Sequence, residues 1–286
     1  MAMRILVVGA GAVGGYFGGQ RAAELRAKGL EIASPHGNAT LTPTIITPEE
    51  MTSRYDLVLL AVKGYSLDGA ITDFASAIGD NSAILPVLNG MRHIGVLSDR
   101  FGGHSVLGGA CIVSNTLDDK GRVLQLTDTQ ELVYGELDGK RSSRLSELDR
   151  VLQGAGFVAR PSANIVGEMW EKWVFAAALG GITCLLRGSI GEIAISPRGR
   201  DLALAMLEEC IQVAAACGQS PRPETVERIR GALTDSGSLL TLSMYRDLQK
   251  GAPTEADTII GDMCMRGDAA GLKMPLLAAA YAQLSI

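Results

Sequence analysis

The chain has 286 residues, of which 47% are hydrophobic and 20% are charged, and its formal net charge is −5 at pH 7. This length can hold two domains with cores of their own, and the composition is ordinary for a soluble globular enzyme. Because the net charge is negative and Lys and Arg form no cluster, we expect neither nucleic acid nor an anionic membrane surface as the main partner.

A glycine-rich turn directly follows the first apolar run, Ile5–Val8. The pattern is G-x-G-x-x-G, in which Gly9 makes the tight turn, Gly11 lets a pyrophosphate approach its backbone, and Gly14 lets the next helix pack closely on the strand. The start of that helix offers unpaired N–H groups to phosphate. The turn therefore predicts a dinucleotide site. Its residues are Gly9, Ala10, Gly11, Ala12, Val13 and Gly14.

Strands and helices alternate through the next part of the chain, which indicates a parallel sheet with right-handed crossovers. A run of Thr, Pro and two Glu at Thr47–Glu50 predicts a helix start. The predicted strands are Leu30–Ser34, Asp56–Val62, Ala83–Leu88, Ser105–Ser114, Glu131–Gly135 and Phe157–Arg160. The predicted helices are 12–28, which ends at Gly29, Leu67–Ile78 and 142–154.

From Ile165 onward almost every segment is predicted to be helical, and Pro161–Asn164 marks the domain boundary. We predict an α/β Rossmann-type dinucleotide-binding domain over residues 1–163 and an all-α domain over residues 164–286. The predicted helices are Ile165–Arg187, from a Ser196-Pro197 cap to about Cys217, from Pro221/Pro223 to about Leu233, from a T-x-x-D cap at Thr254–Asp257 to about Ala270, and one from Pro275.

The cysteines and the apolar segments indicate a cytoplasmic protein. Five cysteines show no C-x-x-C pairing and lie mostly in apolar stretches, which favours free, buried thiols in a reducing cytoplasm over disulfides or a metal site. The apolar start lacks an A-x-A-type cleavage site, so no signal peptide is predicted. The longest apolar run, Trp173–Leu186, has 14 residues. A bilayer needs about 20, so a buried helix is the better interpretation.

Three candidate residues lie at the carboxyl ends of predicted strands, where ligands bind to parallel sheets. Gly9, Lys63 and Asn89 follow the strands that begin at Ile5, Asp56 and Ala83, so we expect them to converge on one cleft. Lys63 could also simply face water after its strand.

Lys172 is the main candidate in the helical half, because tryptophans at 170 and 173 flank it. Desolvation there would favour a general acid near neutral pH. Equally, Lys172 could snorkel at the helix end and pair with Glu168. Glu255 is either a carboxylate favoured by the helix dipole or one that positions the lysine. Ser243 is either an N-cap or a hydroxyl for substrate.

Taken together, the motifs resemble those of the 2-dehydropantoate 2-reductases (ketopantoate reductases) across nearly the whole chain. Several motifs in the right order are far more specific than any one of them. The matching pieces are Gly9–Gly15, Ala61-Val62-Lys63, Leu88-Asn89-Gly90-Met91, Trp170-Glu171-Lys172, Ser243-Met244-Tyr245-Arg246-Asp247 and Pro253-Thr254-Glu255-Ala256-Asp257.

The resemblance implies NADPH-dependent reduction of 2-dehydropantoate to (R)-pantoate in pantothenate biosynthesis, with a hydride passing from nicotinamide to the 2-keto carbon. Lys172 would polarise the carbonyl and supply the proton, and Glu255 would hold the lysine and bind a substrate hydroxyl. Asn89 would orient cofactor and substrate, Ser243 would bind the carboxylate, and Lys63 would line the cofactor site. The second domain would be of the 6-phosphogluconate-dehydrogenase C-terminal type. Since such apolar helical domains often pair, a homodimer is compatible with it.

The first departure from the family lies on the helix that carries Lys172. Four and eight residues further on, the family usually has asparagines that touch substrate, and this chain has Ala176 and Gly180. A polar ligand would meet an apolar wall there, so a reductase of another 2-keto acid remains an alternative.

A second departure lies after the glycine-rich turn. The family has a strand there, ending in an arginine that meets the 2′-phosphate of NADPH, whereas Gly18–Ala23 continues into the following helix. Either the chain lacks this strand, or the numbering closes over a missing segment near Gly19–Arg21. We favour the second interpretation, because a deletion would remove a central strand. The choice between NADPH and NADH stays open here.

Two functions other than 2-keto acid reduction share features with this sequence. A 3-hydroxy acid or polyol-phosphate dehydrogenase can also combine a Rossmann domain with a helical domain and a lysine. A nucleotide-binding sensor without catalysis is disfavoured by Lys172 and Glu255, because a sensor needs no proton donor.

Overall fold

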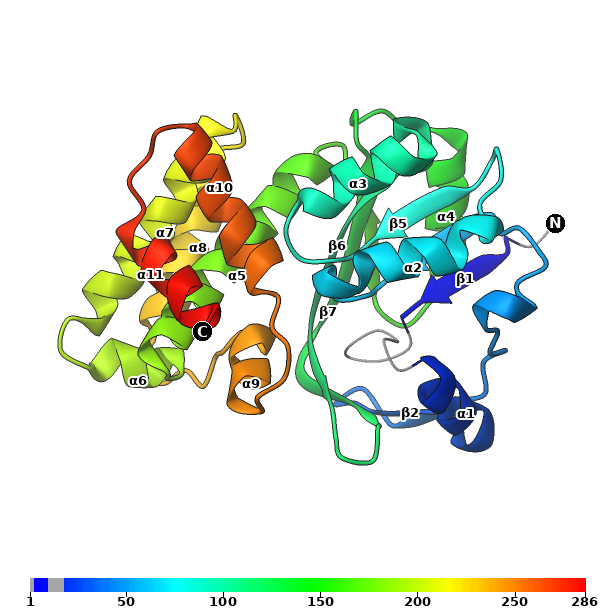
Figure 1. The fold of residues 1–286 in the computed structure, drawn as a ribbon, viewed down its shortest axis with the longest axis horizontal. Helices are drawn as coiled ribbons and strands as arrows, with labels where there is room; N and C mark the ends of the chain where they lie inside the picture. The colour runs from blue at the N-terminus through cyan, green and yellow to red at the C-terminus, as the bar shows by residue number, and fades with distance from the viewer. Residues whose placement is uncertain (1–2, 10–17) are drawn as a thin grey trace. The chain divides into compact units, whose positions relative to one another are not determined.

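The computed structural model describes residues 3–9 and 18–286, with side chains from residue 22 on in the second range. The contacts divide the chain into two compact units (Figure 1). Unit 1 comprises Met1–Leu88 and His93–Ile165, and unit 2 comprises Asn89–Arg92 and Val166–Ile286. The domain limits expected from the sequence, 1–163 and 164–286, stay a proposal, and Asn89–Arg92 belongs to the second unit by its contacts.

Unit 1 contains a three-stranded parallel sheet in the order β1-β4-β5. Its strands are β1 (Ile5–Val8), β4 (Leu57–Leu60) and β5 (Ala83–Pro86). All of β5 is buried, as is most of β4, because helices cover both faces of a parallel sheet. The parallel pairing predicted from the continuous apolar runs is therefore confirmed for these strands.

A second sheet in unit 1 is mixed, and this differs from the parallel pattern that we expected throughout. Two long strands form an antiparallel hairpin at its centre, with a register shift between Val113 and Asn115. The hairpin was predicted only in part, because its outer half alternates polar with half-buried residues instead of forming an apolar run. The strands are β2 (Leu30–Ala33), β3 (Ala39–Leu41), β6 (Leu107–Leu117), β7 (Val123–Glu136) and β8 (Val158–Pro161).

The segment around Gly19–Arg21 is one continuous helix, α1 (Gly18–Lys28), which leads through Gly29 directly into β2. The expectation that the numbering closes over a missing segment near Gly19–Arg21 stays a prediction, because residues 10–17, directly before this helix, lie outside the described part. Among the described residues, β2 pairs with β3 and β7, whereas β1 pairs with β4. The predicted helical residues 12–17 lie outside the described part.

Short helices complete unit 1. The predicted helix start at Thr47 is a single 3-10 turn, Pro48–Glu50, with the expected capping box. Helix α3 was not predicted, although Ile94, Leu97 and Phe101 have the helical spacing of an apolar stripe. The helices are α2 (Leu67–Phe74), α3 (Arg92–Phe101) and α4 (Ser143–Leu152).

Unit 2 is helical and is built around α5 (Ile165–Leu186). This helix is longer than the apolar run that predicted it, and its length and composition would suffice to cross a membrane. The apolar window is 78% buried inside the protein, as expected for a core helix. The other helices are α6 (Ile190–Ile195), α7 (Gly199–Ala216), α8 (Pro223–Thr234), α9 (Ser243–Gln249), α10 (Asp262–Ala269) and α11 (Pro275–Leu284).

One predicted helix cap in unit 2 is wrong, and of the two alternatives for Ser243 the N-cap is excluded. Ser196 is the C-cap of α6, a helix that was missed although Ser189 and Glu192 form a capping box at its start. Leu242 is the N-cap of α9, so Ser243 is its first residue rather than its cap. The helix expected after the T-x-x-D signature is present, but it begins with a π-helical segment, Asp257–Gly261, before it continues as α10 to Ala269.

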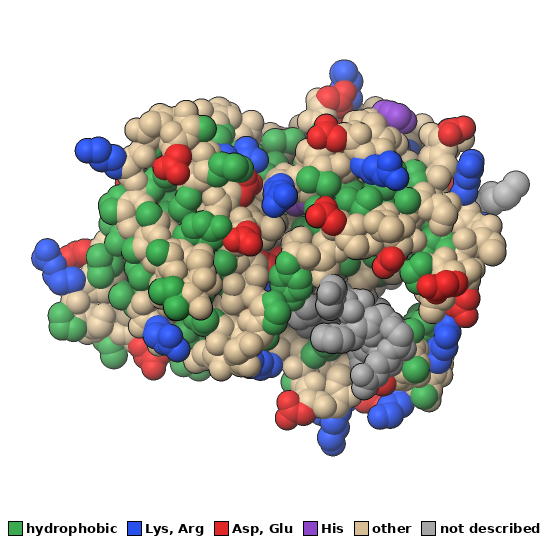
Figure 2. Space-filling view, viewed as in Figure 1, with side chains coloured by type: hydrophobic (Ala, Val, Ile, Leu, Met, Phe, Trp, Pro, Cys, Tyr) green, Lys and Arg blue, Asp and Glu red, His purple; other side chains and the backbone are tan. Residues whose placement is uncertain are grey.

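Charges are interspersed on the face shown in Figure 2, where Lys and Arg side chains alternate with Asp and Glu over both units. This arrangement agrees with the modest net charge of −5. All five cysteines are free, but the expected burial holds only for Cys184 and Cys210, since the other three are of intermediate exposure. Burial raises the pKa of the Cys184 thiol to about 12, which keeps it protonated and unreactive.

Candidate active site

The carboxyl ends of β1 and β4 meet closely in unit 1. Gly9 has φ of +106°, and a Cβ on it would lie 2.6 Å from the carbonyl oxygen of Ala61. Only glycine fits there, because both the backbone conformation and the contact exclude a side chain. The backbone N–H of Ala61 donates to the carbonyl of Val8 across 2.8 Å, and Lys63 follows two residues later, 7% exposed.

This edge has the features that a dinucleotide phosphate site requires at its start. A glycine with positive φ ends the first strand, and Lys63 is held beside the neighbouring strand. The described part of the turn therefore fits a nicotinamide dinucleotide. The other predicted turn residues lie outside the described residues; these are Ala10, Gly11, Ala12, Val13 and Gly14.

In unit 2 the structure brings Asn89 and Glu255 together. The Asn89 side-chain amide Nδ2 donates to Oε2 of Glu255 across 3.3 Å, and Glu255 is 3% exposed. Gly90 has φ of +78°, and a Cβ on it would lie 2.5 Å from the carbonyl oxygen of Thr258. The turn that carries Asn89 thus rests directly on the segment that carries Glu255.

Helix α5 contacts the same segment next to Lys172. The indole Nε1 of Trp173 donates to the carbonyl of Ile259 across 2.9 Å. The backbone N–H of Ile259 in turn donates to the carbonyl of Glu255 across 3.0 Å. Trp173, the residue next to Lys172, is therefore hydrogen-bonded to the backbone one turn beyond Glu255. Lys172 itself is of intermediate exposure.

The backbone after Glu255 is itself unusual. Residues Asp257–Gly261 form a π-helical segment before α10 begins. Such segments are rare and occur frequently at functional sites, because the extra residue per turn redirects side chains. Sequence reasoning missed it, since the capping signature there predicted an ordinary helix start.

Ser243 begins α9, which packs against α5 two turns beyond Lys172. A Cβ at Gly180 would lie 2.7 Å from Cδ2 of Leu242 and 2.8 Å from Cε of Met244. Because Gly180 has no side chain, Leu242 and Met244, which flank Ser243, can pack closely against α5 at this point. Ala176, one turn nearer to Lys172, is 4% exposed. The apolar wall that the sequence indicated is present on this helix face.

The charges around these residues are compensated locally. Burial of Glu171 opposes its charged form, but hydrogen bonds from Arg222 outweigh it and hold the pKa of the Glu171 carboxyl below 4.5. Burial lowers the pKa of the Arg246 guanidinium, whose Nη1 donates to the carbonyl of Thr241 across 3.1 Å. Arg246, like Ser243, belongs to α9.

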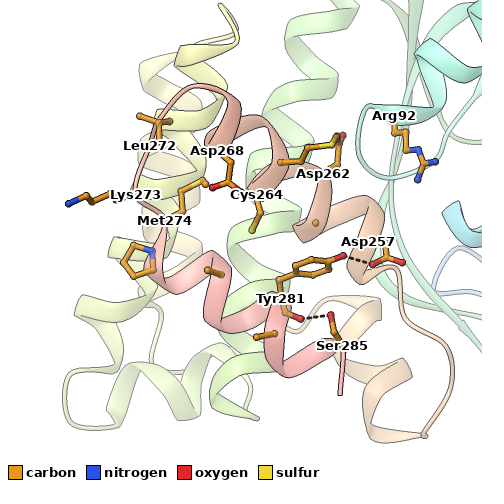
Figure 3. Close-up of a pocket in the computed structure, with 15 residues that line it drawn as sticks. Arg92, Asp257, Asp262, Cys264, Asp268, Leu272, Lys273, Met274, Tyr281 and Ser285 are labelled. Atoms are coloured by element: carbon orange, nitrogen blue, oxygen red, sulfur yellow. Dashed lines mark hydrogen bonds between the residues drawn. The ribbon is translucent and has the colours of Figure 1, made fainter.

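A groove in unit 2 lies between α10 and α11 (Figure 3). The Tyr281 hydroxyl donates to Oδ1 of Asp257 across 2.7 Å at its centre. Arg92 and Asp257 line it, whereas the candidates at 89, 172, 243 and 255 do not. Within the described residues, no group of three or more His, Cys, Asp or Glu side chains could hold a metal ion.

The structure therefore brings the candidates together in two sets. Gly9 and Lys63 share the strand edge of unit 1. Asn89 and Glu255 are hydrogen-bonded in unit 2, where the turn of α5 after Lys172 contacts the segment after Glu255. The expectation that both sets line one cleft stays a prediction.

Comparisons with known proteins agree across most of the chain. The sequence profile described as "Ketopantoate reductase PanE/ApbA" matches residues 5–139, and the profile described as "Ketopantoate reductase PanE/ApbA C terminal" matches residues 164–286. An oxidoreductase of Bacillus subtilis named YkpB, itself uncharacterized, is 33% identical and covers 99% of this chain and 98% of its own length. A 2-dehydropantoate 2-reductase of Archaeoglobus fulgidus is 26% identical over 94% of this chain and 92% of its own.

The fold is also shared with a solved enzyme of another name. A D-mandelate dehydrogenase, solved with NADH and anilino(oxo)acetate, superposes with a TM-score of 0.88 at 20% identity, covering 99% of this chain and 97% of that one.

The alignment with the Bacillus subtilis oxidoreductase YkpB spans 299 positions. This exceeds the 286 residues of the present chain, so at least 13 positions of that relative have no counterpart here.

Proposed function

The chain belongs to the ketopantoate reductase family of oxidoreductases, and from this premise we propose that it catalyses NADPH-dependent reduction of 2-dehydropantoate to (R)-pantoate. The observation that carries the proposal is the hydrogen bond between Asn89 and the buried carboxylate of Glu255, beside the turn of α5 that follows Lys172. A carboxylate, an amide and a lysine are the groups that a carbonyl reduction needs for proton supply and orientation.

The cofactor would be held at the strand edge of unit 1. Gly9 would begin the phosphate turn, the turn residues Ala10 to Gly14 would continue it, and Lys63 would line the site. When bound, the nicotinamide would supply a hydride to the carbonyl carbon. The preference for NADPH over NADH belongs to this proposal.

The chain's own residues would do the rest. Lys172 would polarise the carbonyl oxygen through Nζ and give it the proton. Glu255 would hold the lysine and accept a hydrogen bond from a substrate hydroxyl, and Asn89 would fix the carboxylate of Glu255. Ser243, at the first turn of α9, would donate to the substrate carboxylate.

A second candidate substrate class is favoured by one observation. Leu242 and Met244 fill the space at Gly180, and Ala176 is buried, so two amide groups that family members offer to substrate are replaced by apolar atoms. A 2-keto acid with an apolar side chain would fit such a wall better than the hydroxylated 2-dehydropantoate. The solved D-mandelate dehydrogenase of similar fold is consistent with this alternative.

The test is the oxidation of NADPH and of NADH by purified protein, followed at 340 nm, with 2-dehydropantoate and a panel of aliphatic and aromatic 2-keto acids. We expect turnover with at least one of them. Tight binding of cofactor without any turnover would contradict the enzyme assignment. A higher kcat/KM for an apolar 2-keto acid than for 2-dehydropantoate would select the second substrate class.

The role of Lys172 is tested by Lys172→Ala against the exposed control Lys250→Ala. Loss of a positioned proton donor typically costs a factor of about 10² to 10⁴ in kcat. The Kd for NADPH should change less than about twofold, because the cofactor would bind to unit 1. Equal losses in kcat and in cofactor affinity would count against the assigned role.

The homodimer expected from the sequence is retained as part of this proposal. A structural neighbour described as a dimeric ketopantoate reductase from Staphylococcus aureus supports this part of the proposal. Light scattering at several protein concentrations measures the oligomeric state directly, and a monomer at all of them would refute it.

A further inference from the structure

The only two tryptophans of the chain, Trp170 and Trp173, lie on either side of Lys172 in the sequence and form one cluster. The rings of Trp170 and Trp173 lie 4.8 Å apart between centroids and are tilted by 48°. Both are nearly fully buried. Because they flank Lys172 in α5, whatever fixes these two rings also fixes the helix turn that presents the lysine.

Arg266 of α10 contacts both rings. Its guanidinium carbon lies 5.5 Å from the centroid of Trp170 and 5.4 Å from that of Trp173. A planar guanidinium over an aromatic face gains both stacking and electrostatic attraction, which a lysine ammonium does not match. One cation therefore holds the pair together from a neighbouring helix.

Asp262 sets the orientation of this guanidinium. Its Oδ1 accepts a hydrogen bond from Nε of Arg266 across 3.2 Å, one helical turn away. Asp262 is 4% exposed, and its Oδ2 has no hydrogen-bond partner. A buried carboxylate in this state depends on the nearby positive charge, so Asp262 and Arg266 form a matched pair.

The same cluster is joined to the segment of Glu255. Trp173 donates to the carbonyl of Ile259 in the π-helical segment, and Ile259 donates in turn to the carbonyl of Glu255. The path from Arg266 through Trp173 to Ile259 thus connects α10, the Lys172 turn of α5 and the backbone of Glu255. All of these residues belong to unit 2.

We propose that Arg266, oriented by Asp262, is a positioning residue of the reaction: by clamping the Trp170–Trp173 pair it sets Lys172 of α5 relative to Glu255. The proposal rests on the roles of Lys172 and Glu255 given under the proposed function. Arg266 acts through the two indoles and is not assigned any contact with substrate or cofactor. Sub-ångström to ångström errors in the placement of a catalytic group lower kcat strongly.

The test uses Arg266→Lys and Arg266→Met, with Arg228→Lys on the exposed surface of α8 as the matched control. Because the chain has no other tryptophan, selectively excited tryptophan emission reports on this cluster alone, and the tryptophan bands of the near-ultraviolet circular dichroism spectrum arise from the same two rings. We expect both Arg266 variants to lose the signal of the coupled rings. We also expect kcat for the best 2-keto acid to fall about tenfold or more, with KM and the Kd for NADPH changed less than about twofold.

Asp262→Asn keeps the volume and the hydrogen-bonding shape of the side chain while removing its charge, and should lower kcat in the same direction by a smaller factor. If an Arg266 variant fails to fold, Asp262→Asn provides the test in its place. A lost ring signal with unchanged kcat would overturn the proposal, as would a fall in kcat that only matches the fraction of unfolded protein. If the wild-type protein turns over no 2-keto acid, the proposed function fails and this inference with it; an active wild type with unaffected variants refutes the inference alone.

Discussion

Glu171 of α5 accepts three hydrogen bonds from Arg222, at the start of α8: one from its backbone N–H at 2.9 Å, one from Nε at 2.8 Å and one from Nη2 at 2.6 Å. This contact attaches α8 to the central helix one residue before Lys172. Since Arg222 is about half exposed, its contribution is moderate, and we expect Glu171→Gln to cost about 1–2 kcal/mol of unfolding free energy.

The pH dependence of this contact follows from the lowered pKa of Glu171. The folded-state pKa lies below the ordinary 4.5, so the stabilisation is complete above pH 4.5 and is lost as the pH falls towards the folded-state value. Urea titrations from pH 7 to pH 3.5 should show the wild type and Glu171→Gln converging below pH 4.5. Glu224→Gln, which alters an exposed carboxylate 3.9 Å from Arg222, is the control. Divergence on acidification would contradict this account.

Gly9 should tolerate no side chain. Gly9→Ala places a Cβ against the Ala61 carbonyl in addition to straining the backbone, whereas Gly37→Ala, with φ of +120° and open space around it, meets the strain alone. We expect Gly37→Ala to cost about 1–2 kcal/mol and Gly9→Ala about 1–3 kcal/mol more. Thermal unfolding without cofactor measures the difference. Equal losses would mean that the close approach at Gly9 is unimportant.

Glu209 of α7 caps α11. Its carboxylate accepts from the backbone N–H groups of Leu276 at 3.0 Å and Leu277 at 2.8 Å, in the first turn after Pro275. Glu209→Ala leaves one buried and one part-buried donor without this acceptor, so we expect a loss of about 1–3 kcal/mol. Glu208→Ala, next to it but half exposed, should change stability by less than about 0.5 kcal/mol. Chemical denaturation distinguishes the two, and similar values for both would refute the capping role.

Gly180 should behave differently from a glycine on an open helix surface. Gly231→Ala in α8 meets no atom within 4 Å and should stabilise by about 0.5–1 kcal/mol. Gly180→Ala should instead be neutral or cost up to about 1 kcal/mol, because its Cβ meets the flexible ends of Leu242 and Met244, whose displacement offsets the helix-propensity gain. Combining it with Leu242→Ala should make the two effects less than additive in a double-mutant cycle. Strict additivity would show that the side chains simply move aside.

Much of the fold was predictable because apolar runs and turn residues act locally. The strands β4 and β5 and the long helix α5 followed from continuous apolar sequence, and Pro275 and Pro48 marked helix starts. The second sheet was less predictable, because its hairpin alternates polar residues whose partners are distant in the chain.

The site divides in the same way. The glycine-rich turn and the lysine between two tryptophans are visible in the sequence. The bond between Asn89 and Glu255 joins residues 166 positions apart, and the π-helical segment depends on tertiary contacts such as the indole of Trp173. Local propensity carries no information about either. The spacing of four residues between Asp262 and Arg266 is typical of an ion pair on a helix. Nothing in the local sequence indicated that Arg266 also contacts the tryptophan rings of α5.

The close packing at Gly180 has an evolutionary consequence. A mutation that introduces an asparagine at position 180 meets the side chains of Leu242 and Met244 at once, so these must move or be smaller for it to fit. Shortening either of them first leaves a void beside glycine, which costs stability. Each single step disturbs the packing although the pair together need not. The residues at positions 180, 242 and 244 are therefore expected to change together rather than one at a time.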